Sequence, residues 1–296
     1  SYSLNHRTRA FLKVQDGCDY KCSFCTIPLA RGKSRSNTIS NVIDNVHKIA
    51  SENIKEIVLT GINLGDFGAN SNETIQYNFF DLVKELDKLD LSVRFRISSI
   101  EPNLLSDEII EFISTSKKFV NHFHIPLQSG SNSVLKLMRR RYDSELYKSR
   151  IKRINRLMPD ACIGVDVIVG FPGEDDDKFL ESMSFIEDLD ISYLHVFKYS
   201  ERNNTHAVTL PNIVNPNIRS KRSKLLRLLS SRKKAAFYNK NIGTIHEVLF
   251  ESEDKNGFIE GFSSNYVRFR RKWDSSLTGC LVESKFTEID SEGFAT

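Results

Sequence analysis

The sequence predicts an α/β fold: an open, partial barrel of six β–α units followed by a small antiparallel β-barrel. Short apolar runs rich in β-branched residues alternate six times with longer segments of helical periodicity. This alternation is typical of parallel strands joined by right-handed crossover helices. Beyond residue 240 the runs stay short and β-like, as in an antiparallel module. Six units are fewer than the eight of a closed barrel, so we expect an open one.

The predicted strands share a short apolar core bounded by turn residues, and they lie at 10–15, 56–60, 93–98, 123–127, 163–169 and 193–199. The predicted helices between them are amphipathic and lie at 40–51, 79–89, 107–116, 144–157 and 177–189. Asn37 or Thr38 suits the cap of the first helix, and Ser106 that of the third. Ligands are expected where the carboxyl ends of the strands meet the following loops.

Composition changes along the chain divide it into three parts. We expect the partial barrel in residues 1–215, a basic linking helix in 216–240 and the β module in 241–296. The linking segment carries nine Lys or Arg and no acidic residue, although the whole chain has a formal charge of only +4. Its apolar face is predicted to carry four leucines, Leu225, Leu226, Leu228 and Leu229. The module's strands are expected at 246–250, 257–262, 266–270 and 280–286.

The overall composition fits a globular protein, with 40% hydrophobic and 27% charged residues among 296. No apolar run approaches the roughly 20 residues that span a bilayer. The five cysteines are too few and too unevenly spaced for a secreted disulfide scaffold. We therefore expect a cytoplasmic monomer with no membrane partner. Because the chain begins with Ser1 rather than Met, we also expect a piece of a longer protein.

Three cysteines follow the first predicted strand on one loop. Cys18, Cys22 and Cys25 have the spacing C-x3-C-x2-C, with Phe24 before the third. Three thiolates can hold three irons of a 4Fe–4S cluster and leave the fourth iron open for a chelating small molecule. The alternatives are a structural zinc site, which needs four ligands and finds no obvious fourth here, and incidental buried thiols. Cys162 and Cys280 stand alone and are expected to be small buried apolar groups.

This cysteine loop after the first β–α strand resembles the radical S-adenosylmethionine (SAM) superfamily. Further blocks resemble its methylthiotransferase family, and the β module resembles the TRAM domain of that family. Residues 15–18, 28–32 and 99–102 are most similar to the branch that methylthiolates threonylcarbamoyladenosine in tRNA. The blocks that carry the family resemblance lie in the same order along the chain, at 27–36, 60–63, 124–131, 138–142 and 166–174.

The resemblance implies that SAM binds at the open iron. Gly61 permits close approach of the backbone to a ligand, Glu101 suits the SAM amino group or ribose, and Arg141 or Arg31 suits its carboxylate. An unpaired Asp166 inside an apolar strand is costly, so it needs a ligand hydroxyl, an arginine or a structural hydrogen bond as partner. Strand-ending turns and rim ion pairs remain the alternatives. The expected cofactor-binding set is Phe24, Gly61, Glu101, Gln128, Arg141 and Asp166.

Two basic groups are expected to contact RNA phosphates: Arg222 and Lys224 in the linking helix, and Arg268 and Arg270 in the module. Aromatic residues interleave with the second group and offer stacking surfaces. The alternative for the helix is a solvated face whose leucines dock on the barrel. The module is acidic overall, which disfavours a general RNA clamp.

The family resemblance implies modification of tRNA beside the anticodon. The cluster, reduced by a donor such as flavodoxin or ferredoxin, cleaves SAM to methionine and a 5′-deoxyadenosyl radical, and the radical takes hydrogen from C2 of the adenine. A methylthio group then comes from a second 4Fe–4S cluster in an N-terminal domain, whose three cysteines this chain lacks. The rival readings are action on isopentenyladenosine, action on a ribosomal-protein aspartate, and a non-catalytic zinc-containing RNA-binding protein.

Overall fold

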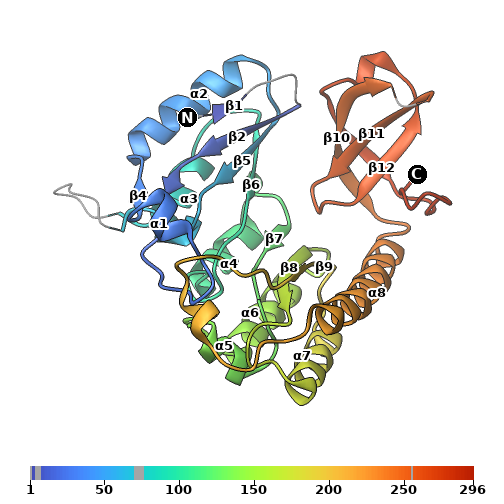
Figure 1. Ribbon diagram of the computed structural model, residues 1–296. Helices are drawn as coiled ribbons and strands as arrows, with labels where there is room; N and C mark the ends of the chain where they lie inside the picture. The colour runs from blue at the N-terminus through green and yellow to red at the C-terminus, as the bar shows by residue number, and fades with distance from the viewer. Residues whose placement is uncertain (1, 4–7, 70–76, 255) are drawn as a thin grey trace.

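Six parallel strands form a curved sheet in the order of the chain, in a computed structural model that describes residues 2–3, 8–69, 77–254 and 256–296 (Figure 1). Pairing is parallel from β2 to β5 to β6 and again from β7 to β8 to β9. A bridge between Ser99 and His124 joins the two halves. The six-unit parallel architecture predicted from the sequence is therefore present. The strands are β2 (Arg9–Lys13), β5 (Glu56–Thr60), β6 (Arg94–Ile97), β7 (His122–His124), β8 (Cys162–Val169) and β9 (Tyr193–Lys198).

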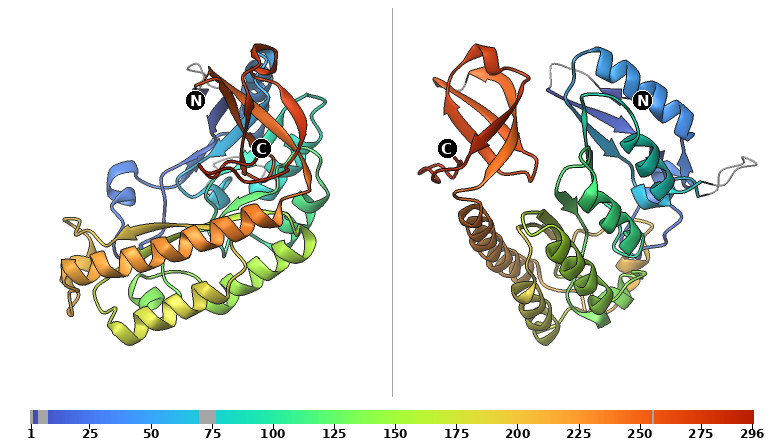
Figure 2. Two further views of the ribbon diagram at one scale, coloured as in Figure 1. Left: turned by 90° about the vertical axis from the view of Figure 1, so that its right-hand side faces the viewer. Right: turned by 180° about the vertical axis from the view of Figure 1, so that it is seen from behind.

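Helices cover the convex face of this sheet, as Figure 1 and Figure 2 show. The predicted caps are present: Thr38 accepts a hydrogen bond from the Asn41 amide, and Ser106 accepts one from the Ile109 amide. Short strands β1 (Tyr2–Ser3), β3 (Gln15–Asp16) and β4 (Arg35–Ser36) accompany the first unit. The helices are α1 (Ile27–Arg31), α2 (Ile39–Ser51), α3 (Phe79–Asp87), α4 (Asp107–Thr115), α5 (Asn132–Leu137), α6 (Ser144–Leu157) and α7 (Asp176–Asp188), with 3₁₀ turns at Leu64–Asp66, His206–Thr209 and Ser275–Leu277.

Side chains alternate between the two faces of each strand, which separates the core from the concave face. On β8, Ile163, Val165 and Val167 are buried in the main core beneath the helices. Asp166 and Ile168 point the opposite way and are only partly buried. We call the concave face of β2 and β5–β9 the lumen.

A single helix, α8 (Pro216–Lys240), links the partial barrel to the C-terminal module and has the bounds expected from the sequence. The prediction of four leucines on its apolar face was wrong for two of them. Leu226 and Leu229 are buried, whereas Leu225 and Leu228 are 47% and 67% exposed. Residues three apart share a helix face, whereas adjacent residues diverge by about 100°. The buried face of the helix therefore holds Leu226 and Leu229 but not Leu225 and Leu228.

The C-terminal module is a curled antiparallel sheet in the order β12-β11-β10-β13 with its own apolar core. No pairing closes β12 onto β13 among the described residues. Instead, Ala295 in the C-terminal tail bridges to Phe269 and Ile289. The small antiparallel β-barrel predicted from the sequence is thus an open half-barrel among the described residues. The strands are β10 (Ile245–Asp254), β11 (Phe258–Ser263), β12 (Arg268–Lys272) and β13 (Leu281–Lys285).

An ion cluster at the amino ends of the barrel strands fastens the module to the barrel. Glu56 is fully buried and accepts hydrogen bonds from Arg94 Nε at 2.7 Å and Arg96 Nε at 2.9 Å. Arg94 also donates to the backbone carbonyls of Glu247 at 3.0 Å and Phe262 at 3.1 Å in the module. The module therefore contacts the barrel at the amino ends of its strands, opposite their carboxyl ends. Within the described residues, every helix is too short or too polar to cross a bilayer.

Candidate active site

The three cysteines lie on the loop between β3 and α1, at the carboxyl end of the first barrel strand. The loop begins at Gly17, whose φ of 71° lies in the left-handed region, and a Cβ there would stand 2.0 Å from the carbonyl oxygen of Lys33. The Cys18 amide donates to the Gly32 carbonyl at 3.1 Å, and the Cys25 amide donates to the Cys22 carbonyl at 3.2 Å. Glycine geometry and backbone hydrogen bonds thus hold a short loop with three free thiols.

Gln15 ties the cysteine loop to the next strand, a role the sequence analysis missed. Its Oε1 accepts hydrogen bonds from the amides of Ile62 and Asn63, both at 2.9 Å. Its Nε2 donates to the Gly17 carbonyl at 2.8 Å. A Cβ on Gly61 would lie 3.0 Å from the same Oε1. The close approach predicted at Gly61 is therefore made by the Gln15 side chain.

The three thiols are not grouped closely enough for all of them to share a single ion. Tetrahedral zinc at about 2.3 Å from each sulfur needs sulfur–sulfur separations of about 3.8 Å. Ligand atoms that could share one ion lie within 4.8 Å of one another at a single place among the described residues, and that place does not include Cys18, Cys22 and Cys25. Thiolates that each bind a different iron stand farther apart. This arrangement disfavours structural zinc. Three cysteine thiolates are the donors that a 4Fe–4S cluster with one open iron takes.

Burial and one arginine set the electrostatics of the thiols. Burial raises the pKa of Cys18 to about 11 and also raises the pKa of Cys22. Arg140 Nη1 donates to Cys22 Sγ at 3.1 Å, and its guanidinium favours the thiolate form. Arg140 is also paired with Glu101, so the carboxylate predicted to bind SAM already has an arginine partner. Sequence reasoning chose Arg141 from the run 139–141, because three adjacent arginines look alike in sequence.

Three further residues predicted to bind the cofactor have different surroundings: Arg141 and Phe24 contact aromatic rings, and Gln128 bonds to β8. Arg141 places its guanidinium 3.9 Å above the centre of the Tyr20 ring. Phe24 packs edge-on against Phe171 at 6.2 Å. Gln128 has a φ of 69°, and its backbone N–H donates to the backbone carbonyl of Asp166 at 2.8 Å.

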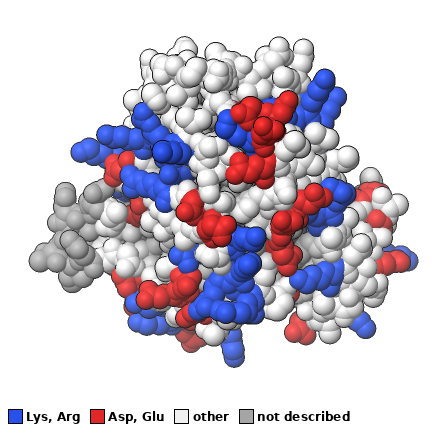
Figure 3. Space-filling view, turned by 90° about the horizontal axis from the view of Figure 1, so that it is seen from below, with Lys and Arg blue, Asp and Glu red and all other residues white. Residues whose placement is uncertain are grey.

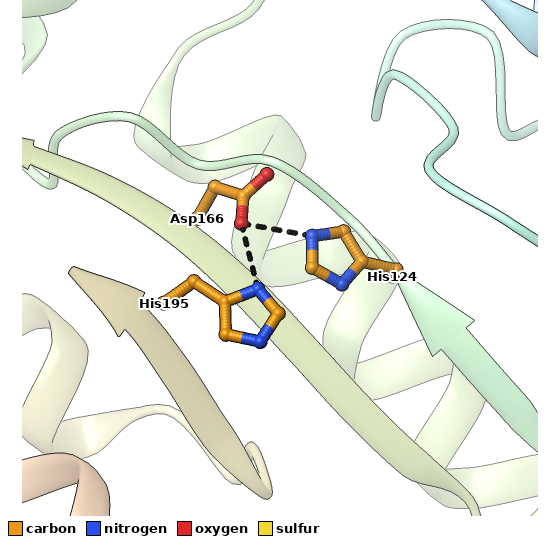
Figure 4. Close-up of side chains that lie close together, drawn as sticks. All are labelled: His124, Asp166 and His195. Atoms are coloured by element: carbon orange, nitrogen blue, oxygen red, sulfur yellow. Dashed lines mark hydrogen bonds and ion pairs between the residues drawn. The ribbon is translucent and has the colours of Figure 1, made fainter. Parts of the chain in front are cut away.

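Asp166 has two histidine partners that the sequence analysis did not anticipate. Its Oδ1 lies 2.9 Å from His124 Nε2 and 3.3 Å from His195 Nδ1 (Figure 4). Burial raises the pKa of Asp166, but the two histidine hydrogen bonds outweigh it and lower that pKa to about 2. A structural hydrogen bond, one of the partners predicted for this carboxylate, is therefore present.

The residues predicted to bind RNA differ in accessibility. Arg222 is only 4% exposed and pairs with Glu174 and Asp176, so it is not available to a phosphate as predicted. Lys224 on the same helix is exposed. In the module, Arg268 pairs with Glu260, and Arg270 pairs with two acidic residues of the tail. Seen from below, the surface intersperses positive and negative side chains (Figure 3). The charged side chains on that face therefore do not form a patch of one sign.

Known proteins resemble this chain in both sequence and fold. Residues 12–186 match the family model of the Radical SAM superfamily. A threonylcarbamoyladenosine tRNA methylthiotransferase, MtaB, of Bacillus subtilis is 41% identical over 96% of this chain and 63% of its own length. The MtaB of Aquifex aeolicus is 37% identical over 89% of this chain and 62% of its own length. A tRNA-2-methylthio-N6-dimethylallyladenosine synthase of Bacillus subtilis is 33% identical over 96% of this chain and 56% of its own length.

Two solved structures share the fold at low sequence identity. The radical SAM methyltransferase TsrM of Kitasatospora setae has a TM-score of 0.54 and 16% identity, covering 64% of this chain and 35% of that one. SuiB of Streptococcus suis has a TM-score of 0.51 and 12% identity, covering 76% of this chain and 47% of that one. The chain thus spans less than two thirds of the length of the MtaB relatives and about half or less of these structures.

Proposed function

Because the chain belongs to the radical SAM superfamily, we propose that it is the catalytic core of a tRNA methylthiotransferase. The proposed substrate is N6-threonylcarbamoyladenosine beside the anticodon, as in the name of the relative with 41% identity. The β module is proposed to be a TRAM-like RNA-binding unit. The observation that carries the proposal is the cysteine loop, which places three free thiols together at the carboxyl end of the first barrel strand.

In this proposal Cys18, Cys22 and Cys25 hold the 4Fe–4S cluster, which together with SAM supplies one-electron reductive cleavage of a carbon–sulfur bond. The electrons come from a low-potential donor such as flavodoxin or ferredoxin. The side chains of the chain position these groups. Arg140 compensates charge on the Cys22 thiolate, and Gln15 fixes the loop after β5 against the cysteine loop. The concave lumen shields the reacting base from water.

Complete methylthiolation also needs a sulfur donor, which the family resemblance assigns to a second cluster. The described residues offer no second set of three cysteines. Cys162 is 2% exposed beneath the module, and Cys280 lies in the module itself. The residues of this chain are therefore proposed to carry out SAM cleavage and to hold the base, but not to supply the sulfur.

Anaerobic reconstitution with iron and sulfide, followed by dithionite and SAM, tests the proposal. We expect about four irons per chain and formation of 5′-deoxyadenosine. Cys22→Ala should abolish both, whereas the matched variant Cys280→Ala should change neither. A colourless protein that takes up zinc and forms no 5′-deoxyadenosine would overturn the enzymatic proposal in favour of an RNA-binding protein.

A further inference from the structure

We propose that His124, Asp166 and His195 read the polar N6 substituent of the substrate base and select threonylcarbamoyl over isopentenyl. The inference rests on the proposed function and deepens it, since it assigns substrate selection to named side chains. The three residues are called the lumen triad below.

The lumen triad lies on the concave face of three adjacent strands. His124 ends β7, Asp166 lies on β8, and His195 lies opposite Asp166 in the parallel register on β9 (Figure 4). On β9 the neighbours Leu194 and Val196 are buried in the main core, so His195 points into the lumen. Its side chain is 53% exposed, compared with 14% for His124 and 23% for Asp166. The triad is therefore open to a ligand on the His195 side.

Neighbours on the same face place the triad close to the cofactor region. Ile168 lies two residues beyond Asp166 on β8, which is about 7 Å along a strand. Ile168 and Phe24 of the cysteine loop pack against the same apolar cluster. The β8 strand that carries Asp166 and the cysteine loop thus border the same apolar cluster, through Ile168 and Phe24.

An apolar shelf beside the triad suits a purine ring. Phe197 lies two residues beyond His195, on the same face of β9, and is 52% exposed. It faces Ile168 across the register. Stacking of a base on an exposed aromatic ring is a common source of affinity for unpaired nucleotides. The lumen therefore offers an apolar surface for the base next to polar groups for its substituent.

The hydrogen-bonding state of the triad favours a polar substituent. With Asp166 ionised, each histidine directs one ring nitrogen to the carboxylate and keeps the other for a further partner. A threonylcarbamoyl group offers amide N–H groups, a carbonyl, a hydroxyl and a carboxylate. An isopentenyl group offers none of these and would cover the histidines without a partner. A site built to bond polar groups rejects an analogue that lacks them.

Two ordinary hydrogen bonds correspond to about a 10- to 100-fold preference in affinity for the threonylcarbamoyl substrate. The competing possibility is a metal ion. The three ligand atoms lie within 4.8 Å of one another, as two histidines and a carboxylate around one divalent ion would. We favour recognition of the substrate because the triad lies beside the apolar shelf, and that shelf adjoins the apolar cluster that also contacts the cysteine loop.

The test compares two anticodon stem-loop RNAs that differ only in the modified adenosine, one with threonylcarbamoyl and one with isopentenyl. Fluorescence anisotropy measures their affinities for the reconstituted, SAM-bound protein. We expect the wild type to prefer the threonylcarbamoyl RNA by at least 10-fold. His195→Phe should reduce that preference to within about twofold, and His195→Gln, which retains a nitrogen near the outer ring position, should restore much of it. The matched control is His47→Phe on the exposed face of α2, which should leave the preference unchanged.

Three results would overturn the inference. One is an equal affinity of the wild type for the two RNAs, and another is an unchanged preference in His195→Phe. The third is a divalent ion, beyond the cluster iron, that the wild type retains and His195→Phe loses, since that result would make the triad a metal site. Failure of the wild type to form 5′-deoxyadenosine would instead overturn the proposed function, so the two failures are distinguishable.

Discussion

Replacing the buried carboxylate of Glu56 is expected to destabilise the protein strongly. In Glu56→Gln the shape of the side chain is kept, but the guanidinium groups of Arg94 and Arg96 lose the charge that compensates them. Arg94 and Arg96 are 5% and 3% exposed, so water cannot replace the lost carboxylate. Removing one partner of a buried ion pair costs about 3–5 kcal/mol. We expect a loss of that size in the free energy of unfolding.

Chemical denaturation followed by two probes measures this loss. Far-UV circular dichroism reports the helices of the barrel, and the fluorescence of Trp273, the single tryptophan, reports the module. Because Arg94 joins the barrel to the module, the Trp273 transition should shift at least as far as the helical one. The matched control is Glu85→Gln, whose carboxylate is exposed and pairs with Lys88, and its cost should stay below about 1 kcal/mol.

The pH dependence of the free energy of unfolding, compared between the wild type and Glu56→Gln, tests the same prediction independently. Burial raises the pKa of Glu56, but Arg96 and Arg94 outweigh it, so the pKa in the folded protein lies well below the usual 4.5. A carboxylate with a lowered folded pKa contributes stability above its unfolded pKa and loses it as the pH falls. Wild-type stability should therefore drop below about pH 4.5 more steeply than that of Glu56→Gln. A loss under 1 kcal/mol in Glu56→Gln, with no difference in pH slope, would refute the reasoning.

Three further predictions concern the cysteine loop and the RNA surface. Gly17→Ala should prevent cluster uptake, measured as iron per chain, because a Cβ at this position has no room. The matched control is Gly243→Ala. Gly243 also has a positive φ, 87°, but a Cβ there would stand in open space, so this variant should take up iron normally. Arg140→Gln should slow 5′-deoxyadenosine formation by roughly tenfold through the lost charge-assisted bond to Cys22, and an unchanged rate would remove its positioning role. Lys224→Glu should weaken tRNA binding in an anisotropy titration by roughly three- to tenfold, and more at low salt; an unchanged affinity would exclude α8 from the RNA surface.

The secondary structure could be predicted closely from local pattern. The bounds of β5, α6 and α8 coincide with those expected, because periodicity and capping residues are local properties. The side-chain environment of α8 was predicted less well. Its charge run suggested a surface that contacts RNA phosphates, yet Arg219 and Arg222 are buried against acidic partners. Those partners lie on other elements, so the helix sequence alone carries no sign of them.

In the candidate site, too, local sequence features were predicted and contacts between distant segments were not. The cysteine spacing lies within one loop and was therefore readable from the sequence. The cost of burying Asp166 correctly predicted a partner, but the identity of the two histidines depends on the register of three strands. Gln15 and Arg140 escaped notice because their partners lie on distant segments of the chain. Sequence reasoning thus pointed to candidate chemical groups and missed the side chains that contact and position them.

The way the module is fastened has a consequence for how this protein can change over evolutionary time. Arg94 donates to the backbone carbonyls of Glu247 and Phe262, and every amino acid provides such a carbonyl. Substitutions at these two module positions leave that part of the junction intact, provided the backbone keeps its course. The selective constraint falls instead on Glu56 and its two arginines. The module sequence can therefore diverge while the barrel keeps its hydrogen bonds to the module backbone.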